Sequence, residues 1–554
     1  MASLAASAGG LTRYRRPQLA IARFAGRRLA RSGAIWGLAF GAYVYANALS
    51  FDTIASTSAR RSSLLTAMAG NTGLKALLGD TRAITTRAGF IDWRAIGVIT
   101  LVASVWALLA ATKWLRGEET AGRWELFLSG PVTSRRAAGN VLAGLAAGVA
   151  AMYALTSGLT MIVGTRPGVG IGVGVGLFFG AACVAGAAVF AAIGALASQV
   201  MATRSRASGL GAGIFGTAFM LRALGDSAPG AHWLVYLSPL GWVEQLHPLA
   251  DPHPLWLLPL AGLTLACAAG AVALAGRDLG ASVLADKDTA GARTGLLGSP
   301  AGLAVRLSWG SVAGWLVATV AAGLLYGTFA KAAGKAFASS SVLSKFTGNL
   351  TTVASRQLQL TGTRVFAGVV FLIMMTLIMA YVASAVNRIR DEEADGHLDN
   401  LLVRSVGRPR WLAGSAGLVL GVLAVAAVFG GLAFWAGVAS QRGGLGLHEL
   451  MLAAVNSAAP AALLLGFGVL TFGFAPRLTA MVCWGTLAWA FGLDMLGSAI
   501  RLNHWLMDTS LLHHMALAPA VNPDWRLVGT YLGLGAGAVL AGGWRFARRD
   551  LAGG

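Results

Sequence analysis

Two short acidic elements, each containing a glycine, carry the residue types in this chain that could act on a partner molecule. In the first, Glu118, Gly122 and Glu125 have the i, i+4, i+7 spacing of one helical face. Carboxylates on an exposed short helix predict docking to a basic groove on another protein, because complementary charges guide association. The two elements are Glu118, Glu119, Gly122 and Glu125, and Glu392, Glu393, Gly396 and Asp399, whose residue numbers differ by 274.

The alternative is that these acids only balance Arg116, Arg123 and Arg390 in a solvated loop. Repetition of the same spacing favours docking, since a loop without a partner has no need to keep it. Each element follows a long apolar segment and is followed by basic residues. These basic residues are Arg135 and Arg136 after the first element, and Arg408 and Arg410 after the second.

Three further anchors repeat in the same order, which predicts a duplicated chain. Each returns 272 or 273 residues later, close to the spacing of the acidic elements. The anchors are Trp36-Gly37, His232-Trp233-Leu234 and Arg277-Asp278-Leu279, which return as Trp309-Gly310, His504-Trp505-Leu506 and Arg549-Asp550-Leu551.

The composition indicates a membrane protein, with the acidic elements at the membrane surface. Hydrophobic residues make up 56% of the chain and charged residues only 12%, whereas soluble domains have about 25% charged residues. Apolar stretches long enough to cross a bilayer as helices recur throughout. They are residues 33–50, 95–115, 137–163, 170–200, 207–224, 254–276, 309–328, 364–387, 411–439, 448–474, 478–498 and 527–545.

These stretches predict an all-α polytopic membrane protein with about twelve transmembrane helices in two homologous six-helix halves. An even number of spans per half makes the repeat parallel, with a central pathway between the halves. Longer segments at 51–94 and 329–364, and proline-containing segments at 225–253 and 499–526, are expected outside the membrane. The predicted domains are 1–32 (a basic amphipathic segment or tail), 33–276 (first half), 277–306 (linker) and 307–554 (second half).

The net charge of +21 indicates orientation rather than nucleic-acid binding. The larger share of the 43 Lys and Arg residues falls on the side that carries both termini. Under the positive-inside rule both termini are cytoplasmic. Arginines in the first 31 residues alternate with apolar residues, which favours contact with anionic membrane lipids.

The first acidic element is similar to a known family. Its pattern Glu-Glu-x-x-Gly-x-x-Glu, followed by Pro131-Val132 and Ser134-Arg135, resembles the cytoplasmic element of ABC type-2 exporter permeases. The duplicated twelve-span form resembles actinobacterial antibiotic-exporter permeases of the tetronasin-transport kind. The resemblance covers essentially the whole chain, and its specificity is concentrated at 116–136 and 388–410.

This resemblance implies that both acidic elements are coupling helices, which contact nucleotide-binding subunits. Glu118, Glu119, Gly122 and Glu125 take that role in one half, and Glu392, Glu393, Gly396 and Asp399 in the other. The second copy has Ser405 where the first has Pro131. This asymmetry suggests that the two halves dock on non-identical surfaces or with unequal strength.

The chain has no P-loop to bind a nucleotide. The sequence Gly-x-x-x-x-Gly-Lys-Ser/Thr does not occur in it, and a P-loop needs that pattern to hold phosphates. We therefore expect no cofactor in this chain, with ATP and Mg bound by a separate ABC ATPase subunit. Two coupling elements imply two ATPase copies per permease chain.

Two other classes of membrane protein are alternatives to this exporter. An ion-coupled secondary transporter needs ionisable residues at membrane depth, for which the sequence offers mainly Asp494 and Glu449. A membrane-embedded enzyme could use His247, His253, His513 and His514 as metal ligands, but no acid–histidine spacing converges. These histidines are expected to be solvated loop residues, and no catalytic or metal site is predicted.

The transported substrate is expected to be a hydrophobic or amphipathic molecule, such as an antibiotic or another drug, exported across a bacterial plasma membrane. In related exporters the second and fifth spans of each half face the cavity. The alternative for each such residue is packing or lipid contact. By this resemblance the pathway residues are Trp106, Phe215, Phe219, Met220, Phe371, Met375, Trp484 and Trp489.

Overall fold

The protein is a bundle of long helices, as expected from the apolar stretches. The computed structural model describes residues 20–54, 57, 79, 83–129, 132–166, 168–227, 230–278, 280–284, 295–339, 362–403, 406–499 and 503–550. Within these ranges the only β-type pairing is an isolated bridge between Met201 and Leu284. The predicted all-α polytopic fold is confirmed.

The chain divides into two compact units, residues 1–48 with 78–289, and residues 49–77 with 290–554. The long helices of unit 1 are α1 (Ala20–Ile54, most of which belongs to this unit), α4 (Arg87–Thr112), α7 (Ser134–Gly164), α8 (Val173–Val200), α9 (Arg204–Ser227) and α11 (Leu257–Leu274). Its short elements are η3 (Lys113–Gly117), α5 (Glu118–Thr120), α6 (Arg123–Leu128), η4 (His232–Leu237), α10 (Pro239–Glu244) and η5 (Pro254–Trp256).

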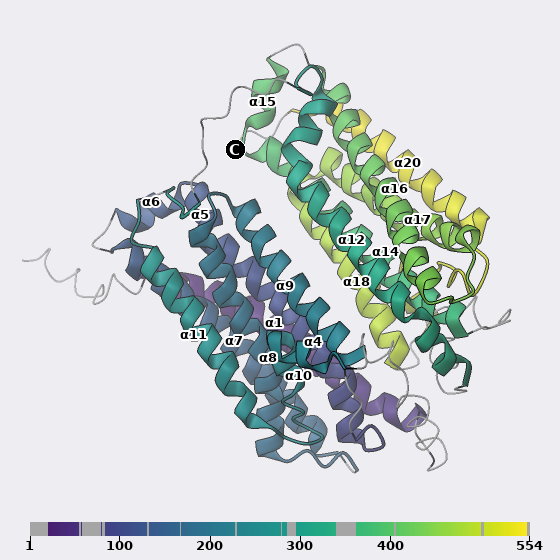
Figure 1. Ribbon diagram of the computed structural model, residues 1–554. Helices are drawn as coiled ribbons and strands as arrows, with labels where there is room; N and C mark the ends of the chain where they lie inside the picture. Colours follow the sequence, from purple (N-terminus) through teal and green to yellow (C-terminus); the bar gives the residue numbers. More distant parts are fainter. Residues whose placement is uncertain are drawn as a thin grey trace, which may run out of the picture. The chain divides into compact units, whose positions relative to one another are not determined.

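Unit 2 also has six long helices, but its short elements differ in number and place from those of unit 1 (Figure 1). Its long helices are α12 (Pro300–Ser339), α14 (Gly362–Ala394), α16 (Arg408–Ser440), α17 (Leu447–Phe474), α18 (Thr479–Ala499) and α20 (Trp525–Arg548). Its short elements are α15 (His397–Leu402), η6 (Pro476–Leu478) and α19 (His504–Met507).

Every predicted span coincides with one of these long helices. In the part of the chain that the structure describes, 11 helices are long and apolar enough to cross a membrane. The twelfth predicted span, 478–498, is occupied by α18. The chain is therefore a multi-pass membrane protein.

Several helices extend beyond the predicted spans. Residues 20–31, expected to lie at the membrane surface, form the first turns of α1 and continue into the span. The start of α12 likewise takes in part of the predicted linker. Some of the sequence predictions concern residues outside the described ranges. These residues are the segment before residue 20, most of 51–82 and the stretch 340–361.

The fourth long helix is the central helix of each unit. The membrane-length windows of α8 and α17 are 72% buried, against 11% and 22% for the last long helices, α11 and α20. Helix α8 packs against α4, α7, α9 and α11, and α17 packs against α14, α16, α18 and α20. A displacement of α8 or α17 therefore affects most of its unit.

Helices α17 and α20 approach closely through glycine. A Cβ built on Gly542 would lie 2.4 Å from the carbonyl oxygen of Val469, and one on Gly473 would lie 2.3 Å from that of Gly542. Small residues allow this approach, which supplies much of the helix–helix packing in lipid.

We expect Gly542→Ala to lower the unfolding midpoint of the purified protein in detergent. The added methyl group forces α20 away from α17, and such overpacking costs about 1–3 kcal/mol. Gly533→Ala in the same helix is the matched control, because a Cβ there meets nothing within 4 Å. That control should gain up to about 1 kcal/mol from lower chain entropy. Equal effects of both changes would contradict the close approach.

Candidate functional site

The first acidic element is two short helices separated by a turn. The π-helical turn η3 and α5 continue α4, and Gly122 then adopts the left-handed conformation, with φ +72°, before α6 begins. The prediction that Glu118, Gly122 and Glu125 share one helical face is therefore wrong. The helix is broken at Gly122, so the i, i+4, i+7 rule does not apply across it.

The second acidic element has the same turn. Helix α14 ends at Ala394, and Gly396 has φ +73° before α15 begins. No neighbouring atom lies within 4 Å of a Cβ built on either glycine. Helices α5 and α6 lie at one end of the long helices of unit 1, and α15 at one end of those of unit 2 (Figure 1). We call these the acidic ends.

We expect Gly122→Ala to loosen the turn at the first acidic element. A left-handed residue with a Cβ costs about 1–2 kcal/mol, which is roughly a 5- to 30-fold change in population. Hydrogen exchange of the Glu125 amide, bonded to the Gly122 carbonyl at 3.2 Å, should accelerate by that factor. Gly122→Asn should change exchange less, since asparagine tolerates this conformation. Gly139→Ala, at an open helical position, should leave it unchanged.

Several of the acids pair with arginines inside their own unit. Glu118 pairs with Arg123, and Glu119 pairs with Arg116 at 2.8 Å. The side chains of Glu118 and Glu119 are only 13% and 16% exposed. Both acids therefore balance an arginine, as in the alternative interpretation, and the expectation that they are exposed is wrong for Glu118 and Glu119.

In unit 2 the second glutamate of the pair is also engaged. Both oxygens of Glu393 accept hydrogen bonds from the Arg549 guanidinium, at 2.6 and 2.5 Å, and both residues are buried. Glu392 is partly buried near the end of α14, and the neighbouring Arg390 pairs with Asp391 instead. The second acid of each element therefore ties that element to its own unit.

Of the acids predicted to form the site, Glu125 and Asp399 are the ones that face outward. Both are exposed and stand in the first turn of α6 and α15. The residue before each, Trp124 or Leu398, is buried and anchors the short helix against its unit. Each acidic end therefore presents an exposed carboxylate on its short helix, beside a left-handed turn, and the second end also exposes Asp391 and Asp395.

The pathway residues predicted in unit 1 lie in packed positions. Trp106 is half-buried and its indole nitrogen donates to the Ser32 hydroxyl of α1 at 2.9 Å. Phe215 packs edge-on against Phe190 of α8, with ring centroids 5.2 Å apart. Phe219 and Met220 are partly buried in α9.

The corresponding residues of unit 2 fall into two groups. Phe371 and Met375 are buried in α14, and Phe371 packs on Phe434 of α16 at 5.5 Å. Trp484 and Trp489 of α18 are exposed, and the Trp489 indole donates to Thr509 at 2.8 Å.

A buried charge network at the opposite end of unit 1 was missed by the sequence reasoning. Arg222 of α9 pairs with Glu244 of α10 at 2.7 Å and with Asp226 at 3.2 Å. Asp92 and Arg94 of α4 are also buried. These charges are buried within the protein near the ends of α4 and α9, and the sequence analysis did not predict them. Arg222, inside the predicted span 207–224, was the available signal.

Two of the loop histidines are also more buried than expected. His247 and His513 are 5% and 3% exposed, so they are not solvated, whereas His514 is partly buried and His253 is exposed. Within the described ranges, no three His, Cys, Asp or Glu side chains are grouped closely enough to hold a metal ion.

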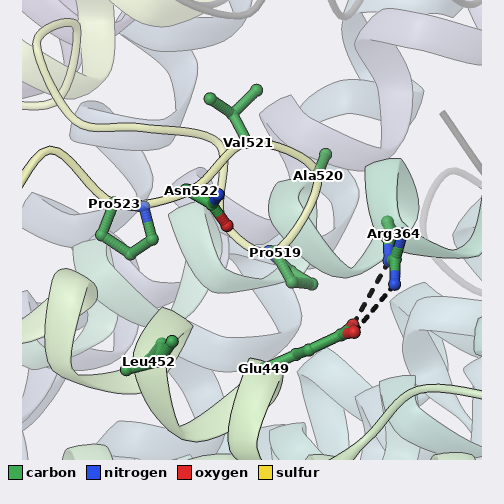
Figure 2. Close-up of a pocket in the computed structure, with 8 residues that line it drawn as sticks. All are labelled: Arg364, Glu449, Leu452, Pro519, Ala520, Val521, Asn522 and Pro523. Carbon is green, nitrogen blue, oxygen red and sulfur yellow. Dashed lines mark hydrogen bonds and ion pairs between the residues drawn. The ribbon is translucent and has the colours of Figure 1, made fainter. Parts of the chain in front are cut away.

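Unit 2 has a pocket of about 240 Å³ at the end opposite its acidic element. The Arg364 guanidinium binds both oxygens of Glu449, at 2.8 and 3.2 Å. Figure 2 shows the two side chains pointing toward one another beside the segment 519–523. Glu449, a candidate for ion coupling in the sequence, is thus neutralised by an arginine at the start of α14.

Comparison with known proteins shows similarity to transport proteins. The family model described as "Multidrug efflux system permease Rv1217c, C-terminal domain" matches residues 25–276 and 297–547. The Multidrug efflux system permease protein Rv1217c of Mycobacterium tuberculosis (strain ATCC 25618 / H37Rv) is 29% identical over 518 residues, covering 91% of this chain and 89% of that protein. The resemblance to exporter permeases is confirmed, and this chain belongs to the Rv1217c family of multidrug efflux system permeases.

Proposed function

We propose that this chain is the permease subunit of an ATP-driven ABC exporter. It would move hydrophobic or amphipathic compounds, such as antibiotics and other drugs, out of the cell. ATP and Mg would be bound by a separate ATPase, because the chain has no P-loop sequence. Its membership of an efflux permease family supports the transport part of the proposal.

The observation that carries the ATPase part is the repeated geometry of the acidic ends. Two left-handed glycines, Gly122 and Gly396, precede short helices that each present one exposed carboxylate, Glu125 or Asp399. A fixed turn and an exposed charge give a partner both shape and electrostatic complementarity. Glu118, Glu119, Glu392 and Glu393 would support these contacts.

The same repetition supports a duplicated permease with one ATPase contact in each half. The two halves would be parallel, and the two acidic ends would lie in the cytoplasm with both termini, as the charge distribution favours. Two ATPase copies would then serve one permease chain in the bacterial plasma membrane. Exported compounds would pass helices α4, α9, α14 and α18, which carry the predicted pathway residues.

Co-purification is the direct test of this proposal. We expect an ATPase with a P-loop to remain bound to the tagged permease in detergent, with two ATPase chains per permease by mass measurement. A complex with that ratio that exports a drug only when ATP is present supports the proposal. A permease that purifies alone and transports in vesicles without ATP contradicts it.

The second candidate function, ion-coupled secondary transport, is favoured by one observation. Asp92 is 4% exposed, and its Oδ1 atom has no hydrogen-bond partner in the described structure. Carboxylates buried at membrane depth serve proton relays in pumps. Transport driven by a pH gradient alone and lost in Asp92→Asn would establish this candidate instead.

A further inference from the structure

A buried guanidinium lies at the same place in each unit, although it comes from different parts of the chain. In unit 1 it belongs to Arg116, which is 1% exposed and directly precedes the acidic element. In unit 2 it belongs to Arg549, which follows the last helix. Arg390, the sequence equivalent of Arg116, points instead to its neighbour Asp391 and is 35% exposed.

The first guanidinium joins three segments of unit 1. Its Nη1 donates to Glu119 at 2.8 Å, its Nε donates to the Ser198 carbonyl at 2.9 Å, and its Nη2 donates to the Ala281 carbonyl at 3.1 Å. Glu119 also accepts the Gly280 backbone N–H at 2.8 Å. The acidic element, the end of α8 and the segment after α11 therefore meet at one side chain.

The second guanidinium joins the equivalent segments of unit 2. It holds both oxygens of Glu393, and its Nη2 donates to the Phe472 carbonyl near the end of α17 at 3.4 Å. Glu393 and Phe472 each stand 274 residues after Glu119 and Ser198. Arg549 also lies over the Phe472 and Phe546 rings, 5.2 Å from each centroid.

We propose that these two contacts, which we call the arginine nodes, transmit movement of the acidic elements to the central helices α8 and α17. Arg116 and Arg549 are then positioning residues that couple ATP hydrolysis to transport, an inference that rests on the proposed function. Because a guanidinium is planar with donors in a fixed fork, moving the carboxylate moves or breaks the bond to the helix end. Two different arginines reach the same point, so the guanidinium itself is what each unit requires.

The nodes divide the acids of each element between two tasks. Glu119 and Glu393 face inward onto the nodes, whereas Glu125 and Asp399 face outward. Substituting the outward acids should weaken ATPase binding. Disturbing the nodes should leave binding intact and remove only the response of the helices to nucleotide.

The test is hydrogen exchange of the full permease with its co-purified ATPase, with and without a non-hydrolysable ATP analogue. In the wild-type complex, nucleotide should change exchange at the ends of α8 and α17. The double variant Arg116→Lys, Arg549→Lys keeps both charges but loses the fork. We expect it to bind the ATPase normally while the nucleotide-dependent change falls about threefold or more, within the range seen for coupling networks.

Arg390→Lys is the matched control and should leave the nucleotide-dependent change as it is in the wild type. If the double variant does not fold, Glu119→Gln with Glu393→Gln gives the same readout, because glutamine keeps the shape and removes the charge. A wild-type response in folded node variants overturns the inference, as does loss of ATPase binding. A wild-type permease that binds no ATPase overturns the proposed function first and this inference with it.

Discussion

Reversing the two outward charges, Glu125→Lys with Asp399→Lys, should abolish drug export while the membrane helices stay folded. Both carboxylates are exposed, so lysine there meets no steric obstacle in the permease. If each carboxylate faces a basic groove on the ATPase, a lysine in its place should cost about 2–5 kcal/mol of binding free energy. That corresponds to at least about a 30-fold loss of ATPase affinity per site. Titration of the ATPase subunit and drug accumulation in cells would measure both effects.

The matched control is Asp251→Lys, which reverses an exposed carboxylate between α10 and η5, away from the acidic end. It should leave ATPase affinity and export unchanged. Reversal at Glu125 alone should weaken binding at one site only, so that a permease with one ATPase remains. Undiminished export by the double variant Glu125→Lys, Asp399→Lys would mean that the acidic ends do not bind the ATPase.

Replacing Arg549 by methionine should lower the stability of unit 2 more than any surface change in it. The buried Glu393 carboxylate would lose the guanidinium that binds both of its oxygens, and breaking one side of a buried pair typically costs about 3–5 kcal/mol. The unfolding midpoint of the purified protein in detergent should fall accordingly. Arg390→Met removes an exposed pair and should cost no more than about 1 kcal/mol.

The double variant Arg549→Met, Glu393→Leu separates the charge effect from packing. With both charges gone the site becomes apolar, and such replacements of buried pairs are often neutral or stabilising. We therefore expect recovery of most of the lost stability but no recovery of nucleotide response. If the double variant is as unstable as the single one, packing of Arg549 against Phe472 and Phe546 is the main contribution.

The positions of the helices could be predicted from the sequence because lipid imposes one length and one polarity on each span. All twelve predicted stretches fall on helices. The outward acids were also within the predicted site, since repeated spacing marked them. Hydropathy did not predict the full length of the helices. Helices α1 and α12 extend beyond the apolar stretches into more polar residues.

The interior of the site was harder to predict, because its contacts join residues far apart in the chain. Glycine after a helix often marks a left-handed end, so the turn at Gly122 could have been expected. The pair Arg116–Glu119 has i, i+3 spacing and could also have been found. Nothing local connects Glu393 with Arg549, which are 156 residues apart, and only the fold brings them together.

Because the two buried arginines come from different parts of the chain, single segments of the two units cannot be exchanged without consequence. Grafting the segment around Arg116 and Glu119 into the second half would bring a second cation against Arg549, with one carboxylate for both. The reverse graft would carry Arg390, which points to its own neighbour, so Glu393 would depend on Arg277, which in the first half donates to the Gln199 carbonyl at the end of α8 at 3.3 Å. Engineered hybrids would therefore have to exchange complete units, so that each acidic element stays with the segment after α11 or α20 that takes part in its arginine node.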